Sequence, residues 1–130
     1  PKRQPHVLRA PCPWGSGQTY AECCAPWHEG TPAPTPEALM RSRYSAYVLG
    51  YIDYLLETWH PSTAPGELEL GFTKWTGLEV LHAQANLDAG VVEFVARYKV
   101  NGKAEKLHEV SRFVLENGRW LYIDGQQPEA

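Results

Sequence analysis

The residues of this chain most suited to metal or redox chemistry are three cysteines, at positions 12, 23 and 24, which lie around a Gly-Ser-Gly turn. Thiolates are good zinc ligands, and glycines let the backbone fold tightly enough for several ligands to converge on one ion. Three cysteines cannot complete a disulfide framework, so a metal or redox site is the better interpretation. The imidazole of His28 follows shortly after and offers a further ligand. We therefore predict a candidate metal site formed by Cys12, Cys23, Cys24 and His28.

The run CPWGSG at residues 12–17, with the cysteine pair at 23 and 24, resembles the SEC-C motif, whose usual form is C-P-C-G-S-G-x5-C-[CH]. The resemblance implies a small zinc-binding element that contacts a protein partner. Trp14 stands where the motif has its second cysteine, whereas a structural zinc site takes four ligands. Two alternatives therefore stay open. The turn has lost its zinc and packs under Trp14 and Trp27, or Cys12 forms a disulfide with one of the paired cysteines on oxidation.

A proline-rich segment, residues 30–34, indicates an extended connector between two parts of the chain. It separates an N-terminal cysteine turn with its connector, residues 1–34, from a second domain, residues 35–130. The second domain opens with a helix signal. Thr35 is a good N-cap, Pro36 suits the first helical position, and Glu37 places a carboxylate near the helix N-terminus.

Large side chains then recur at helical spacing and predict one buried stripe, made of Met40, Tyr44, Tyr47, Val48 and Tyr51. Arg41 and Arg43 fall about 80° to either side of this stripe at about 100° per residue, so we expect them to border the buried face. Gly50 interrupts the pattern. Residues 52–59 continue it as a second short helix or a bent extension, which Pro61 ends.

Four strands are expected after these helices, at residues 78–86, 91–100, 107–115 and 120–124. The pairs Asn101-Gly102 and Asn117-Gly118 are strong hairpin signals. Residues 62–74 are predicted to be a loop, with a short helical piece around residues 67–70 or a further strand within residues 65–75 as additions. Helices followed by a strand meander predict an α+β fold, with N-terminal helices packed on a curved antiparallel sheet.

Alternation along the strands predicts two faces of the sheet. One face is aromatic and carries Phe94, Ala96, Tyr98, Leu107, Phe113, Leu115, Trp120 and Tyr122, with Glu109, Ser111 and Asp124 among them. The opposite face carries valines and charged side chains, Arg112 among them. Both faces are half apolar, so we expect one to pack on the helices and the other on a second copy of the chain, as a homodimer.

Carboxylates on the aromatic face need partners if they are buried, because an isolated buried carboxylate is costly. One interpretation is an ion-pair network that ties the helices to the sheet. The other is a pocket in the cavity between them, with a carboxylate or His60 as general base. If it is a pocket, we expect a volume of about 300 Å³ or more, lined by Glu109 and His60. The candidate pocket residues are Arg41, Arg43, Tyr44, Trp59, His60, Glu109, Arg112 and Asp124.

Four further runs extend the resemblance beyond the cysteines: LMRSRYSAY at 39–47, YLLETWHPS at 54–62, HEVSRF at 108–113 and NGRWLYIDG at 117–125. They are similar to the YchJ family of bacterial proteins, and the resemblance covers roughly residues 12–125. That family joins a SEC-C motif to a domain of the nuclear-transport-factor-2-like (NTF2-like) type, related in shape to cystatin. The resemblance implies a cone of helices on a curved sheet.

Composition narrows the function only broadly. The net charge of -3 gives no general attraction to nucleic acid or anionic lipid. No apolar run is long enough for a membrane span, and no signal peptide is evident, so we expect a cytoplasmic protein. The motifs of nucleophile elbows, phosphate loops and dinucleotide sites are missing from the sequence. We expect a binding or adaptor module; the alternative is a small-molecule pocket or an enzyme of the dehydratase or isomerase kind.

Overall fold

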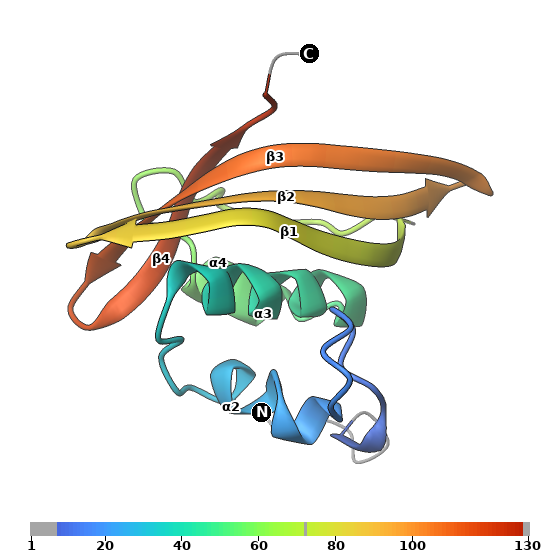
Figure 1. Ribbon diagram of the computed structural model, residues 1–130, viewed down its shortest axis with the longest axis horizontal. Helices are drawn as coiled ribbons and strands as arrows, with labels where there is room; N and C mark the ends of the chain where they lie inside the picture. The colour runs from blue at the N-terminus through green and yellow to red at the C-terminus, as the bar shows by residue number, and fades with distance from the viewer. Residues whose placement is uncertain (1–7, 72, 129–130) are drawn as a thin grey trace.

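The computed structural model describes residues 8–71 and 73–128. They form three layers: a sheet, two helices beneath one of its faces, and the cysteine-containing segment on the far side of those helices (Figure 1). The elements in chain order are η1 (Tyr20–Glu22), α2 (Ala25–His28), α3 (Pro36–Leu49), α4 (Ile52–Glu57), β1 (Lys74–Asn86), β2 (Ala89–Val100), β3 (Lys103–Glu116) and β4 (Arg119–Gln126). The predicted α+β fold is confirmed. No helix within the described residues is long and apolar enough to cross a membrane.

Helix α3 is the central element, because it separates the sheet from the cysteine segment (Figure 1). It starts as predicted: the hydroxyl of Thr35 accepts a hydrogen bond from the backbone N–H of Ala38 at 3.0 Å. It ends at Gly50, which has a left-handed backbone. A helix covered from two sides buries more than one stripe, and Arg43 is accordingly only 5% exposed. The expectation that Arg43 borders the buried face was therefore wrong.

The sheet is a four-stranded antiparallel meander in the order β1-β2-β3-β4. Asn101 and Asn117 have φ angles of 52° and 53° and each is followed by a glycine with positive φ, as two-residue hairpin turns require. Each strand extends beyond its predicted limits, and β1 already begins at Lys74. Residues 67–70 have no regular secondary structure, so the short helix suggested there is not found.

A bulge in β4 changes which side chains face the helices. Arg112 lies opposite Asp124, but its neighbour Phe113 lies opposite Tyr122, so Ile123 is one residue extra. The hydroxyl of Thr63 donates to the carbonyl of Ile123 at 2.6 Å, which holds the bulge from the preceding loop. Asp124 consequently shares a face with Arg112. The prediction that it lies on the aromatic face was wrong, because strict alternation fails at a bulge.

The segment before the sheet covers the free edge of β4. The backbone N–H of His60 donates to the carbonyl of Tyr122 at 2.7 Å, and the N–H of Tyr122 donates to the carbonyl of Thr58 at 2.8 Å. These bonds form an isolated parallel bridge between Trp59 and Tyr122. They fix α4 and the loop after it against β4, and protect this edge of the sheet from further strand pairing.

Candidate functional site

The cysteine segment, residues 8–34, is folded by a few backbone hydrogen bonds into a compact knuckle. The N–H of Cys12 donates to the carbonyl of Gln18 at 2.9 Å, and the N–H of Tyr20 donates to that of Ala10 at 2.8 Å. Thr19 caps η1, and this short helix carries the chain into Cys23 and Cys24. The fold of this segment thereby places Cys12 next to Cys23 and Cys24.

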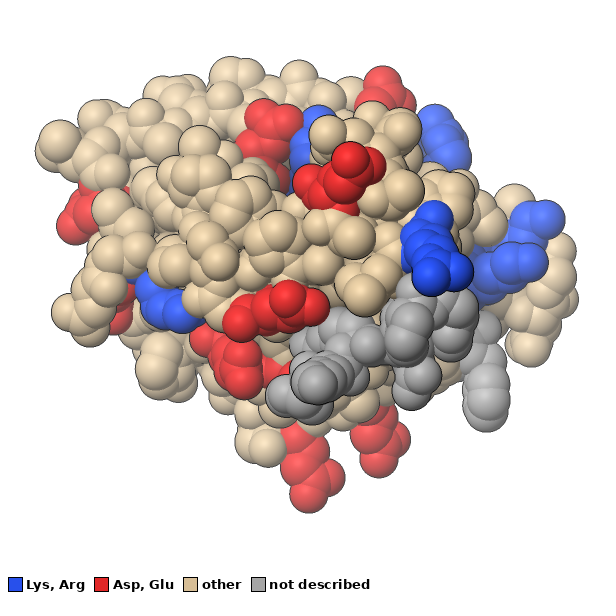
Figure 2. Space-filling model, turned by 90° about the horizontal axis from the view of Figure 1, so that it is seen from below, with Lys and Arg blue, Asp and Glu red and all other residues tan. Residues whose placement is uncertain are grey.

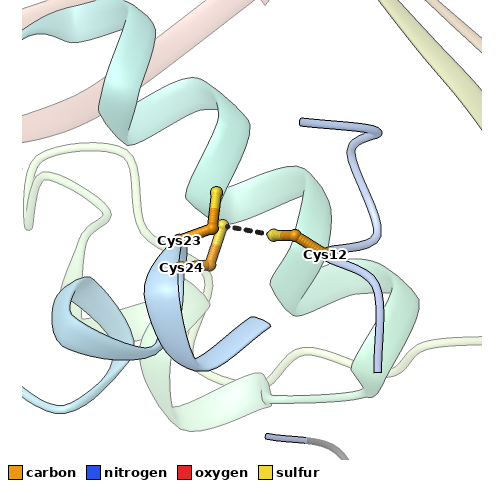
Figure 3. Close-up of side chains that lie close together, drawn as sticks. All are labelled: Cys12, Cys23 and Cys24. Carbon is orange, nitrogen blue, oxygen red and sulfur yellow. Dashed lines mark hydrogen bonds between the residues drawn. The ribbon is translucent and has the colours of Figure 1, made fainter. Parts of the chain in front are cut away.

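The three thiols converge at this point (Figure 3). Their sulfur atoms all lie within 4.8 Å of one another, and those of Cys12 and Cys24 are 3.2 Å apart and share a hydrogen bond. All three cysteines are free, and Cys12 and Cys24 are buried. Zinc–sulfur bonds of about 2.3 Å in a tetrahedron place sulfurs about 3.8 Å apart. The cluster therefore forms a group that could hold a metal ion at three corners.

Thiol ionisation in the cluster is uneven. The hydrogen bond with Cys24 lowers the pKa of Cys12 to about 6, against the opposing effect of burial. The same contact, followed by burial, raises the pKa of Cys24 far above its ordinary value. Burial also raises the pKa of Cys23. Cys12 is thus the first thiolate, and a metal ion would have to displace the protons of the other two.

His28 does not join the thiols. Its Nδ1 is hydrogen-bonded to the hydroxyl of Tyr20, and its Nε2 is 2.7 Å from the backbone carbonyl oxygen of Ser42. The group of potential ligands found among the described residues contains the three cysteines and not His28. A polar side chain that does contact the thiols is Ser45 of α3, whose hydroxyl oxygen is 3.3 Å from the sulfur of Cys24. Sequence reasoning missed Ser45 because nothing in its spacing relates it to the cysteines.

Arg41 also belongs to the knuckle side of α3. Its guanidinium carbon lies 4.3 Å from the ring centroid of Trp14, and its side chain pairs with Glu37 at 2.8 Å. It does not line the cavity between α3 and the sheet. Trp14 replaces the expected second ligand, and its ring is stacked on a cation.

On the other side of α3, a cavity of about 220 Å³ lies between this helix and the sheet. Its walls are mostly apolar and include Trp75, Phe94 and Phe113. The polar groups that line it are Arg43, Tyr44, Tyr47, Glu109, Ser111 and Tyr122. The cavity is smaller than the expected pocket, and of the two residues expected to line it only Glu109 does.

Arg43 is the buried cation of this cavity. It donates to the carbonyl of Leu55 and to the hydroxyl of Thr58, both at 2.7 Å. Its guanidinium carbon lies 4.6 Å from the ring centroid of Tyr122 and 5.1 Å from that of Trp59. Burial lowers the pKa of Arg43, although nearby tyrosines oppose the shift. An arginine nonetheless stays protonated in a protein, so a positive charge lies at the cavity wall.

Glu109 is the carboxylate of the same cavity. Its Oε2 accepts a hydrogen bond from the hydroxyl of Ser111 at 2.6 Å. The side chain lies against Gly125, where any larger residue would collide with it: an added Cβ would be 2.1 Å from its Oε2. Burial first, and the charge of Glu109 second, raise the pKa of Tyr122 to about 12. The hydroxyl of Tyr122 therefore stays protonated at neutral pH.

The other predicted pocket residues lie elsewhere. His60 is bonded through Nε2 to Glu116 at 2.7 Å and through Nδ1 to Ser62, outside the cavity. Arg112 and Asp124 form a two-bonded ion pair on the outer face of the sheet, each contact at 2.7 Å. The hydrogen bonds from Arg112, helped by its charge, stabilise the ionised carboxylate and lower the pKa of Asp124. The structure brings Arg43, Tyr44 and Glu109 together in the cavity. Trp59 packs against the guanidinium of Arg43 without lining the cavity, and Arg41, His60, Arg112 and Asp124 lie away from it.

Comparison with known proteins agrees with this architecture. Residues 35–125 match the family described as "YchJ, middle NTF2-like domain". The chain belongs to the YchJ family. A UPF0225 protein of Chromobacterium violaceum is 56% identical to it over 126 residues, covering 90% of this chain and 93% of that protein. A UPF0225 protein of Bordetella parapertussis is 50% identical, covering 95% and 97%.

Two solved structures resemble this YchJ-family chain over both the knuckle and the cone. A SEC-C motif containing protein from Rhodopseudomonas palustris has 35% identity and a TM-score of 0.81, covering 91% of this chain and 98% of that one. A SEC-C motif containing protein from Psychrobacter arcticus has 28% identity and a TM-score of 0.80, covering 96% and 86%. The resemblance to the YchJ family and to its NTF2-like fold is thus confirmed.

Proposed function

We propose that this YchJ-family protein is a binding module whose knuckle holds a zinc ion and contacts a protein partner. The observation that carries the proposal is the convergence of three thiols, from two separate segments, within 4.8 Å. Thiolates select zinc among the common divalent ions. Cys12, Cys23 and Cys24 would hold the ion at three corners. The fourth corner has no cysteine, because Trp14 occupies that place in the motif.

The knuckle is tied to the cone, so that a bound ion would stabilise both. Ser45 on α3 contacts the thiols, and the carbonyl of Ser42 on the same helix bonds to His28 of α2. Two similar proteins of known structure carry the words "SEC-C motif containing" in their descriptions. Zinc in such a site acts structurally, through folding free energy rather than through chemistry on a substrate.

The surface around the knuckle suits a protein partner better than a nucleic acid. Figure 2 shows the knuckle side, where acidic and basic side chains are interspersed and no continuous basic area covers the described residues. Trp14, Trp27 and Arg41 are partly exposed in this part of the molecule. Tryptophan and arginine are the residue types most enriched in interface hot spots. We infer that this surface is the contact site.

Elemental analysis of the purified protein tests the metal. We expect one zinc per chain, and less than a tenth of that in a Cys23→Ser, Cys24→Ser double variant. Wild type and this variant, immobilised side by side, then test the partner: proteins retained by wild type should be lost from the variant. An Arg112→Gln variant, altered on the outer face of the sheet, is the control and should retain them. Identical partner sets for all three proteins would remove the knuckle from consideration.

A further inference from the structure

A second site, independent of the knuckle, is indicated by the charge of Arg43. Buried charges in proteins are usually paired with an opposite charge, because an uncompensated ion is costly to remove from water. Within the part of the chain that the structure describes, no carboxylate oxygen lies within 4.0 Å of this guanidinium, whereas Arg41, Arg97 and Arg112 each have one. Neutral oxygens and two aromatic rings are its partners instead.

This cation lines a cavity that has room for a small molecule. An apolar cavity of about 150 Å³ is enough to bind benzene, and the cavity here measures about 220 Å³. Its deeper walls, such as Phe94, Ala96 and Phe113, are buried, while Trp75 and Leu107 are partly exposed and connect it to the surface. The walls suit an apolar body of about six carbon atoms, with space left for one polar group.

The geometry points to a binding site for small organic carboxylates, with the carboxylate on the guanidinium of Arg43 and an apolar or aromatic body against the walls. Arginine presents parallel N–H donors that match a carboxylate. A ligand carboxylate would supply the negative charge that the fold itself does not place beside Arg43. Glu109 limits the choice, because its own charge in the cavity disfavours ligands with a second anionic group.

Calorimetric titration tests this assignment with two matched pairs of probes: benzoate against benzamide, and hexanoate against hexanamide. Each pair shares its size and body, and differs in charge. We expect at least one carboxylate to bind saturably, at least tenfold more tightly than its amide. If neither carboxylate binds at concentrations up to about 10 mM, or if the amides bind equally well, the assignment is wrong.

Four variants locate the binding. Arg43→Met should weaken carboxylate binding by about tenfold to a hundredfold, the effect of losing charge-assisted hydrogen bonds. Arg41→Met is the matched control, because it removes an arginine from the opposite side of the same helix, and it should leave binding unchanged. Ala96→Leu keeps the arginine but fills the cavity, and should abolish binding. Glu109→Gln removes the competing charge and should strengthen binding several-fold.

The variants also supply the contradicting outcomes. Equal losses in Arg43→Met and Arg41→Met would mean that the effect is not specific to the buried guanidinium. Unchanged affinity in Ala96→Leu would place the ligand outside the cavity. Either result overturns the proposal. Should Arg43→Met fail to fold, Ala96→Leu and Glu109→Gln still decide, because neither removes the hydrogen bonds that Arg43 makes to Leu55 and Thr58.

Discussion

Two buried polar groups stand next to each other on α3 and differ in how they are satisfied. The carbonyl of Ser42 bonds to His28 of the knuckle, and its hydroxyl is 2.7 Å from that of Tyr54 on the neighbouring helix α4. Arg43, the next residue, faces the cavity with a charge that no carboxylate of the described chain neutralises within 4.0 Å. The polar atoms of Ser42 are satisfied within the protein, and their bonds join the helix layer to the knuckle. The charge of Arg43 has no opposite charge beside it, and a ligand carboxylate would provide one.

Removal of a metal from the knuckle should have the largest effect on stability. If zinc binds the three thiols, binding free energy adds to folding free energy, by about 4 kcal/mol when free zinc is a thousand times the Kd. A strong chelator should therefore lower the free energy of unfolding of wild type by about this amount, measured by urea denaturation. The Cys23→Ser, Cys24→Ser variant is the control and should not respond. An unchanged wild-type midpoint would exclude a structural metal.

Loss of the central histidine should come next. His28→Ala removes a buried ring that lies 4.5 Å from the ring of Tyr54, together with its bonds to Tyr20 and Ser42. We expect the free energy of unfolding to fall by about 3 kcal/mol, from lost packing and lost buried hydrogen bonds. His108→Ala, on the outer sheet face, is the control and should cost about 0.5 kcal/mol or less. Similar losses in both variants would contradict this network of buried hydrogen bonds.

Parts of this arrangement could be predicted from local sequence. The helix start at Thr35 and the two Asn-Gly hairpins are local signals, each decided by a few neighbouring residues. The position of Asp124 could not be predicted, because the bulge at Ile123 is held by Thr63 from a distant loop. The depth of Arg43 was missed for the same kind of reason. Its burial follows from α3 lying between two layers, which helical periodicity does not report.

The candidate metal site could also be predicted only in part from the sequence. The close spacing of Cys23 and Cys24 and the glycine turn were sufficient to predict that the thiols meet. The partners of His28 were not predictable, because Ser42 and Tyr20 reach it through tertiary packing of α2 on α3. The resemblance to the YchJ family gave the fold, but it contained no information on the charge state of the cavity.

The knuckle can be completed by one substitution, with a smaller expected effect. Trp14→Cys restores the second cysteine of the motif and offers zinc a fourth thiolate. We expect zinc affinity to rise at least tenfold, about 1.4 kcal/mol, in competition with a colorimetric chelator. Trp14→Phe, which keeps an aromatic ring beside Arg41, is the control and should bind zinc as wild type does. No gain in the cysteine variant would mean that position 14 does not point at the ion.

The claim that Arg43, unlike its neighbour Ser42, is left to pair with a ligand is tested most directly by urea unfolding. Wild type and Arg43→Met are compared, each with and without saturating benzoate. A ligand that binds only the native state raises its stability. We predict that benzoate raises the midpoint of wild type but not that of Arg43→Met. Without ligand, Arg43→Met should be less stable than wild type by about 1–3 kcal/mol, because the buried carbonyl of Leu55 and the hydroxyl of Thr58 lose their donor. No effect of benzoate on the midpoint of wild type would show that Arg43 is purely structural.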